Sequence, residues 1–419
     1  MKLTNQKFTM RSSIFRSFLS FSKQKQLLAL PTPNGKVMRI LEPLIFLTLF
    51  FGIFCTIGHF MGVSEMLNTI MRTAFDLLIN TCFYLMGITV LSGALGKLLV
   101  EFGVVRMLEA ILRPLMKPLF RLPGVAALGA VLTFLSDNPA IIALAKDREF
   151  SRYFKKYQLI SLTNFGTAFG MGLIVMVFMI ALSNKVPGAS TGALIGLLGA
   201  VVGCIVSTRL MQRFTLRAHP EYKDEEAYEG PAPETTGIPQ EVRKESTFIR
   251  ALNAILDGGK TGVDLGLAII PGVLVISTAV MMMTFGPKGD EGQYMGVAYE
   301  GVPVLPWLAG KISFVFDWLF GFKSPELVAF PITALGAVGA ALGLIPAFVN
   351  DPSIVFDANA IAVCTAIGMC WSGYLSTHTA MLDSLGYRKL IGKAIGAHTI
   401  GGLCAGVFAH WLYVLIALF

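Results

Sequence analysis

The second half of this chain repeats short motifs of the first half in the same order. RT-x-x-DL at Arg72–Leu77 returns as KT-x-x-DL at Lys260–Leu265, and TAFGM at Thr167–Met171 returns as TAIGM at Thr365–Met369. The remaining matches pair Leu128–Ala140 (LGAV, seven residues, PA) with Leu335–Ala347, Ile195-Gly196 with Ile395-Gly396, and Cys204 with Cys404. Collinear matches at nearly constant offset predict an internal duplication. In membrane proteins an inverted duplication is typical of alternating-access carriers.

The composition is that of a membrane protein. Of 419 residues, 54% are hydrophobic and 14% are charged, whereas soluble domains carry about 25% charged residues. The net charge of +8 matches a basic N-terminal segment, residues 1–41, in which eight Lys and Arg residues precede the first acidic residue, Glu42. We predict that this segment is cytoplasmic and contacts anionic lipid, with an interfacial helix over 8–30, and that it does not bind nucleic acid.

The run that follows, Leu44–Met61, is long enough to span a bilayer and shows no small-residue cleavage site, so a cleaved signal peptide is not expected. The six cysteines all lie in apolar stretches without a C-x-x-C pair or a zinc-type histidine spacing. They are predicted to be packing residues, and neither a disulfide framework nor a metal site is indicated.

Nine apolar runs are candidates for membrane-embedded segments, most of them near the ~20 residues that cross a bilayer. They are 42–62, 70–96, 123–145, 158–183, 190–210, 257–285, 325–349, 358–380 and 393–418. Two further segments, 101–121 and 304–323, mix charges with apolar residues at helical spacing and predict helices at the membrane interface.

Run 123–145 is predicted to be a re-entrant hairpin. Basic clusters flank it on both sides, and the positive-inside rule places both clusters in the cytoplasm. Its centre, Ser136-Asp137-Asn138-Pro139, is turn chemistry, which is tolerated at membrane depth only against protein or a water-filled cavity. The repeat counterpart, 325–349, is predicted to be a second hairpin with its tip at Gly343–Pro346.

With the N-terminus inside, this topology makes the two repeats antiparallel. Segment 42–62 is then an extra peripheral transmembrane helix, 70–210 the first repeat, 213–256 a cytoplasmic linker, and 257–418 the inverted second repeat, with the C-terminus outside. The predicted class is an all-α polytopic membrane protein of a bacterial cytoplasmic (inner) membrane.

Asp137 and Asn138 at the hairpin tip are the first candidate site residues. A carboxylate at mid-membrane usually marks a substrate pathway or a coupling ion. The alternative is that these residues only cap the second hairpin arm, since Asp and Asn before Pro are favourable N-caps.

Two spans mix hydroxyls and glycines in a way that predicts helices broken at the midplane. In the first, Thr163, Asn164 and Thr167 are candidate substrate ligands; the alternative is close small-residue helix packing. In the second, the candidates are Thr365, Trp371, Ser372, Ser376 and Thr377, where an aromatic ring could stack on a planar ligand and hydroxyls could bind its polar edge. His378 is a candidate proton carrier or a satisfied structural histidine.

Asp76 and Asp264 occupy equivalent places in the matched motifs and are candidate ion-coupling residues. Each follows a basic residue by four positions, so a self-neutralised helical pair is the alternative. Gly258-Gly259-Lys260-Thr261 is not a phosphate loop, because position 254 is alanine and no strand precedes it. No catalytic or metal-ligand set is found, so neither an enzyme nor a cofactor is expected.

Three features resemble the nucleoside-recognition Gate-domain family of membrane proteins. They are the interfacial helix before a hairpin (Val104–Leu122), the LSDNPA tip (Leu135–Ala140) and the glycine-threonine span TNFGTAFGMG (Thr163–Gly172). That family is similar to concentrative nucleoside transporters and to the membrane part of the bacterial ferrous-iron permease. The resemblance implies two Gate-type halves, each with an interfacial helix, a re-entrant hairpin and a broken helix, and a solute held between the hairpin tips and the helix breaks.

We therefore predict a secondary active transporter of a small polar organic solute, with a nucleoside as one candidate, coupled to H+ or Na+. Two alternatives remain open: a non-transporting membrane module that supports a signalling or developmental partner, and an ion or metal permease. The sequence leaves the solute, the coupling ion and the formation of a homo-oligomer undecided.

Overall fold

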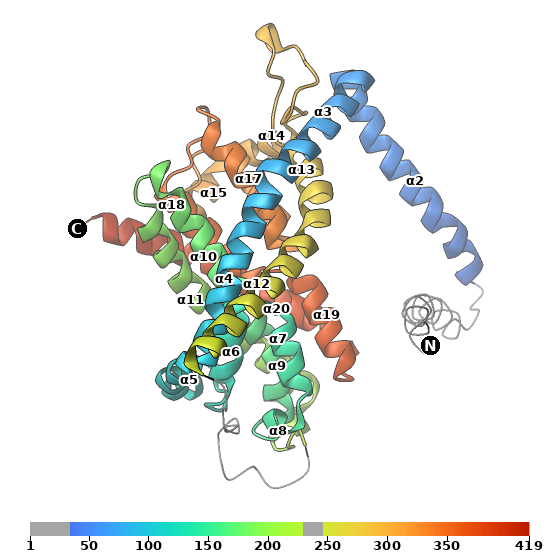
Figure 1. Ribbon diagram of the computed structural model, residues 1–419. Helices are drawn as coiled ribbons and strands as arrows, with labels where there is room; N and C mark the ends of the chain where they lie inside the picture. The colour runs from blue at the N-terminus through green and yellow to red at the C-terminus, as the bar shows by residue number, and fades with distance from the viewer. Residues whose placement is uncertain (1–33, 229–245, 419) are drawn as a thin grey trace, which may run out of the picture. The chain divides into compact units, whose positions relative to one another are not determined.

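The computed structural model describes residues 34–228 and 246–418, with side chains from Leu41 onwards, and these residues are almost entirely helical (Figure 1). Within those ranges no β-strand forms; a single bridge joins Lys155 and Glu226. The helix predicted over 8–30 and the central part of the linker lie outside the described residues. The chain divides into two units, Met1–Phe60 and Met61–Phe419, and helix α2 (Asn34–Met61) accounts for the described part of the first unit.

Seven helical stretches in the described ranges are long and apolar enough to cross a membrane. They are Leu41–Met61, Val63–Glu101, Lys156–Asn184, Ala189–Ala218, Thr247–Met282, Ala358–Ser384 and Arg388–Ala417. They coincide with seven of the nine predicted apolar runs. The other two runs, 123–145 and 325–349, each fold as two shorter helices, as expected for re-entrant hairpins.

The first repeat begins with one continuous helix built from α3 (Val63–Asp76), the π-helical turn η1 (Leu77–Cys82) and α4 (Phe83–Glu101). The elements that follow are α5 (Val104–Leu115), η2 (Met116–Phe120), the hairpin α6 (Ala126–Leu135) and α7 (Pro139–Lys146), α8 (Arg148–Ser151), the broken helix α9 (Lys156–Thr167) and α10 (Gly172–Ala181), η3 (Leu182–Asn184), α11 (Ala189–Ala218) and η4 (Pro220–Lys223).

Over the described residues 246–418, the second repeat follows the same order of main elements, without a counterpart of α8. These are α12 (Thr247–Gly272), the π-helical turn η5 (Val273–Ser277), α13 (Thr278–Met282), η6 (Asp290–Gly292), α14 (Val304–Lys311), α15 (Ser313–Phe320), η7 (Pro325–Val328), the hairpin α16 (Ala329–Gly336) and α17 (Val338–Asn350), the broken helix α18 (Ala358–Cys370) and α19 (Tyr374–Ser384), η8 (Arg388–Leu390) and α20 (Ile391–Ala417). Thus the linker is shorter than predicted, because α11 runs on to Ala218 and α12 starts at Thr247.

The two copies are related by features that the sequence did not reveal. Each first helix carries a π-helical turn, a rare element, and each second half-helix of the broken pair starts from a left-handed residue, Met171 at φ 54° and Gly373 at φ 62°. In Figure 1, α5 and α8 lie at one end of the second unit, whereas α14 lies at the other. This arrangement is consistent with the predicted inversion.

Structural equivalence corrects two of the sequence matches. The first hairpin turns at Ser136–Asn138, and the second turns at Gly336 and Ala337, where the chain becomes extended. The tip predicted at Gly343–Pro346 is wrong, because both residues lie inside α17. Pro346 lies in the interior of α17, and the helix continues past it to Asn350.

The motifs that contain Asp76 and Asp264 are not equivalent either. Asp76 immediately precedes η1, whereas Asp264 precedes η5 by nine residues. Matching short strings therefore placed these pairs out of register, although the duplication itself is present in the order of elements.

The first helices of the two repeats cross at glycines. A Cβ added at Gly258 would lie 2.3 Å from the carbonyl oxygen of Gly93, and one added at Gly262 would lie 2.3 Å from that of Thr89. The Thr89 hydroxyl donates to the Gly262 carbonyl at 2.7 Å. Small residues of this kind let membrane helices approach closely. The crossing of α4 and α12 is therefore a tight packing contact between the two repeats.

We expect Gly262→Ala to destabilise the protein, because the new methyl group would meet backbone atoms that cannot move aside. Overpacking of this kind costs about 1–3 kcal/mol, so the melting temperature in detergent should fall. Gly259→Ala is the matched control, since its nearest neighbour would be the Val90 side chain at 3.8 Å. Equal melting temperatures for the two variants would contradict the tight crossing.

Candidate functional site

A cavity of about 390 Å³ lies where the two hairpin tips meet the two helix breaks. Its lining residues from these elements are Asp137, Asn138, Pro139, Ile142 and Met171 of the first repeat and Gly336, Ala337, Val338, Gly339, Ala340, Ser372, Gly373, Ser376, Thr377 and Ala380 of the second. Helix α12 closes one side with Leu265, Ala268, Ile269 and Gly272. The two hairpins and two breaks predicted to form a site therefore do converge on one cavity.

Asn138 connects both broken helices at this point. Its side-chain Nδ2 donates to the carbonyl oxygen of Ser372 in the second break. A Cβ added at Gly170 in the first break would lie 2.2 Å from the Asn138 Oδ1, so that oxygen packs directly on the glycine backbone. Asn138 is 6% exposed, and its side chain makes no capping hydrogen bond to α7. The capping alternative is thus wrong for Asn138.

Asp137 lines the same cavity and is partly buried. Its carboxylate accepts a hydrogen bond from the backbone N–H of Asn138. Within the described residues, no side chain forms a hydrogen bond or an ion pair with it. A carboxylate at membrane depth without a cationic neighbour is unfavourable unless something else supplies the charge.

Ser376 and Thr377 reach the cavity from the first turn of α19. Both hydroxyls donate to the carbonyl oxygen of Gly373, at 2.9 and 3.0 Å. Because their hydrogens are engaged in this way, the hydroxyl oxygens are left as acceptors. Ser372 of the predicted set also lines the cavity.

Five predicted ligands do not line the cavity. Thr163, Asn164, Thr167, Thr365 and Trp371 are all buried. Asn164 donates to the Ser207 hydroxyl at 2.9 Å and to the Ala394 carbonyl at 3.0 Å, and Thr167 donates to the Thr163 carbonyl within α9. The four polar residues lie before the helix breaks, on half-helices that pack against α11 and α20. The small-residue packing alternative therefore describes them better.

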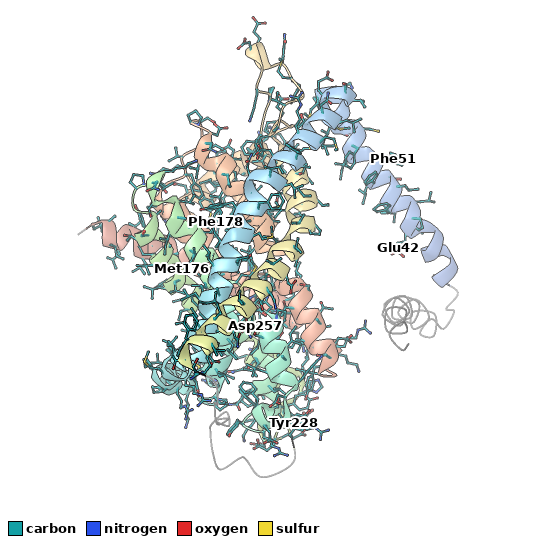
Figure 2. All side chains as sticks on the ribbon, viewed as in Figure 1. Glu42, Phe51, Met176, Phe178, Tyr228 and Asp257 are labelled. Carbon is teal, nitrogen blue, oxygen red and sulfur yellow. The ribbon has the colours of Figure 1, made fainter. Side chains whose placement is uncertain are left out.

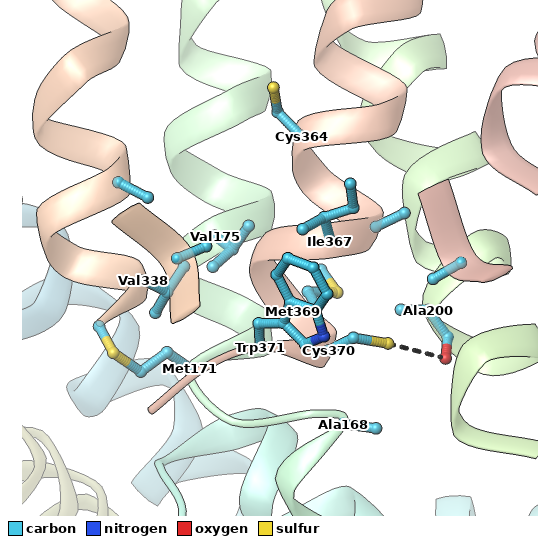
Figure 3. Packing of buried hydrophobic residues seen from close by; sticks show 14 of the residues in the cluster. Ala168, Met171, Val175, Ala200, Val338, Cys364, Ile367, Met369, Cys370 and Trp371 are labelled. Carbon is cyan, nitrogen blue, oxygen red and sulfur yellow. Dashed lines mark hydrogen bonds between the residues drawn. The ribbon is translucent and has the colours of Figure 1, made fainter. Parts of the chain in front are cut away.

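Trp371 is a packing residue as well, and no ligand can stack on its ring in this structure. It is 3% exposed, and its Nε1 donates to the His398 carbonyl at 3.3 Å. Figure 3 shows it within the apolar cluster that also contains Val175, Val338 and Ile367. In the same view the Cys370 thiol points at the Ala200 carbonyl, 3.6 Å away.

His378 lies next to Thr377 in sequence but faces the interior. It is fully buried, both of its ring nitrogens lack a hydrogen-bond partner, and its ring lies 4.7 Å from that of His398. His398 is held on both sides, by the Ser207 hydroxyl at 2.8 Å and by the Cys370 carbonyl. Since a carbonyl only accepts, His398 carries its proton on Nε2.

The two remaining acidic candidates lie outside the cavity. Asp76 accepts hydrogen bonds from Asn80 at 2.7 Å and from the Tyr299 hydroxyl, and the Tyr299 backbone N–H donates to the Thr73 hydroxyl at 2.9 Å. Asp76 therefore fastens the loop before α14 to α3; this contact and burial raise the pKa of Tyr299. Asp264 is exposed on α12 and does not line the cavity.

Sequence reasoning missed the aliphatic part of the lining. Met171, the second hairpin tip and the α12 residues carry no polar signal, and only their position in the fold brings them to the cavity. Within the described ranges no group of three His, Cys, Asp or Glu residues could hold a metal ion, and the six cysteines are free. A larger hollow of about 580 Å³ between α15 and α20 is lined by apolar residues and one cysteine, so it offers little chemistry.

Residues 82–183 match the family model described as Gate, nucleoside recognition. The match runs from the end of η1 through α10 and so covers the first hairpin and the first helix break. Among curated relatives, an uncharacterized protein of Alkalihalophilus pseudofirmus is 26% identical over 221 residues, 52% of this chain and 47% of that protein.

The sporulation integral membrane protein YlbJ of Bacillus subtilis is 36% identical over 74 residues, 17% of this chain and 18% of that protein. The chain thus spans at most about half the length of these curated relatives. Solved structures extend the comparison over most of the chain. CNTnw, a concentrative nucleoside transporter, in an inward-facing substrate-bound state has a TM-score of 0.50 at 13% identity, over 92% of this chain and 88% of that one.

A doubly substituted CNTnw in an outward-facing state gives a TM-score of 0.51 at 14% identity, over 92% and 87% of the two chains. At this identity the likeness shows the fold. The protein is a multi-pass, all-α membrane protein with the concentrative nucleoside transporter fold, as the sequence resemblance implied.

We expect Asp137→Asn to leave the protein at least as stable as the parent in the absence of any solute. The variant removes a charge that lacks a side-chain partner and keeps the shape of the side chain. If Asp137 instead served to cap α7, the melting temperature would fall by the equivalent of about 1 kcal/mol. The measurement is a thermal melt of the purified protein in detergent, with Asp257→Asn on the exposed face of α12 (Figure 2) as the control for loss of one charge.

Proposed function

We propose that this protein is a secondary active transporter that carries a small polar organic solute by alternating access. The observation that supports this most directly is the convergence of both hairpin tips and both helix breaks on one cavity with a carboxylate at its wall. Discontinuous helices of inverted repeats form the substrate sites of such carriers. The Gate-domain match and the fold are consistent with this proposal, and they make a nucleoside one candidate solute.

Asp137, Asn138, Ser372, Ser376 and Thr377 are the proposed solute contacts. The coupling ion is H+ or Na+, and Asp137 is the residue best placed to contact it; buried His378 is a second candidate for H+. We further propose that the protein lies in a bacterial cytoplasmic membrane, with the N-terminus inside and the C-terminus outside. Neither a cofactor nor an enzymatic step is needed for this function.

The alternatives make different demands on the cavity. A membrane module that only supports a partner needs no cavity of this size between its repeats, whereas a channel needs a continuous water path. Cavities of about 300–1,000 Å³ are typical of small-molecule sites, which favours a carrier over both alternatives.

We expect Ser376→Cys to react with a membrane-impermeant maleimide from either face of the membrane, tested separately in right-side-out and inverted vesicles. A carrier that alternates exposes the cavity to each side in turn. The parent protein with Cys55→Ser provides the background, because Cys55 is the exposed cysteine of the described residues. Modification from one face only would contradict alternating access, and single-channel currents would favour a permease pore.

A further inference from the structure

Among the residues that the structure describes, the cavity wall carries one carboxylate, Asp137, and no positive charge beside it. Asp137 is the only charged residue among those that line it, and no Lys, Arg or His of the described chain joins it there. The carboxylate is partly buried and unpaired by any described side chain. Carboxylates at membrane depth pair with a counter-charge, since an isolated ionised group is costly there. An occupant that brings a positive charge would remove this deficit.

The hydroxyl oxygens of Ser376 and Thr377 are available as acceptors on the cavity wall. Both hydroxyls donate their hydrogens to the Gly373 carbonyl, and one of the two N–H groups of the Asn138 amide donates to the Ser372 carbonyl. A solute that donates hydrogen bonds fits such a wall, whereas a solute carrying a carboxylate or a phosphate would meet no cationic side chain.

The rest of the wall is aliphatic. Pro139, Ile142, Leu265, Ile269 and Val338 contribute to it, and no aromatic residue does. Trp371, the one aromatic candidate in the sequence-predicted set, is turned into the core. A planar base would therefore find no ring to stack on. A bare divalent metal ion would find one carboxylate and otherwise only neutral oxygens, so its second positive charge would have no counter-charge.

We infer that the solute of the proposed transporter is a small aliphatic ammonium compound, whose charged nitrogen binds Asp137 and whose hydroxyl or further donor reaches Ser376 and Thr377. This inference rests on the proposed function, since it names the class of solute held in the same cavity. Charge-assisted hydrogen bonds to a carboxylate are the strong ones, so Asp137 would supply most of the selectivity.

The test uses three probes of equal chain length and different charge: 5-amino-1-pentanol, 1,5-pentanediol and 5-hydroxypentanoate. Thermal shifts of the full chain in detergent report binding, because a ligand of the folded state raises its apparent stability. We expect the amino alcohol to bind at least about tenfold more tightly than the diol, and the carboxylate not to bind.

Asp137→Asn should abolish the tenfold difference between the amino alcohol and the diol, whereas Asp257→Asn, the same change outside the cavity, should keep it. Ser376→Ala should weaken the amino alcohol without removing its advantage over the diol. If the parent binds diol and amino alcohol equally well, or binds neither, the inference is overturned.

Two further arms separate this inference from the proposed function. If uridine or adenosine stabilises the parent and Asp137→Asn equally, the inferred ammonium solute is wrong, whereas the proposed transporter function is not contradicted. Stabilisation by NaCl, absent with KCl at the same ionic strength and lost in Asp137→Asn, would make Asp137 an ion site and likewise overturn the ammonium class. The proposed function fails separately, if Ser376→Cys reacts from one face only.

Discussion

The structure depends on a single amide at the tip of the first hairpin. The side-chain oxygen of Asn138 packs against Gly170 in the first helix break, and its Nδ2 donates a hydrogen bond to the Ser372 carbonyl in the second. A broken helix leaves unsatisfied backbone groups, and at membrane depth these need partners from the protein itself. One buried side chain therefore ties the first hairpin to both breaks, and the cavity opens beside it.

Around this contact the fold separates rigid from adjustable parts. The glycine-lined crossing of α4 and α12 and the equally close contact of α11 with α20, where a Cβ at Gly203 would lie 2.6 Å from the Gly401 carbonyl, bring backbones together and cannot shift cheaply. In the alternating access that we propose, the elements that change their arrangement are the hairpin tips and helix breaks that line the cavity.

The fold and the chemistry of the cavity lead to different expectations for the solute. The Gate domain and the concentrative nucleoside transporter fold suggest a nucleoside, but a fold hosts many functions and the site decides among them. The half-helices before the two breaks carry no carboxylate between positions 163 and 172 or between 365 and 374. The single charge comes from the hairpin instead, at Asp137, and an aliphatic wall faces it.

The sequence alone determined the class of the protein, the seven spans, the first hairpin with its tip, and both helix breaks, because hydropathy, charge asymmetry and turn residues act locally along the chain. Of the residues that it predicted as a site, Asp137, Asn138, Ser372, Ser376 and Thr377 line the cavity. The sequence placed the second tip wrongly, since Gly343–Pro346 combines a glycine with a proline and is a stronger turn signal than the single glycine of Gly336-Ala337. Only the tertiary structure decided that Thr163, Asn164, Thr365 and Trp371 face neighbouring helices and that α12 closes the cavity. A polar residue in a helix fully surrounded by protein can point toward a cavity or toward packing, and that choice depends on neighbours distant in the sequence.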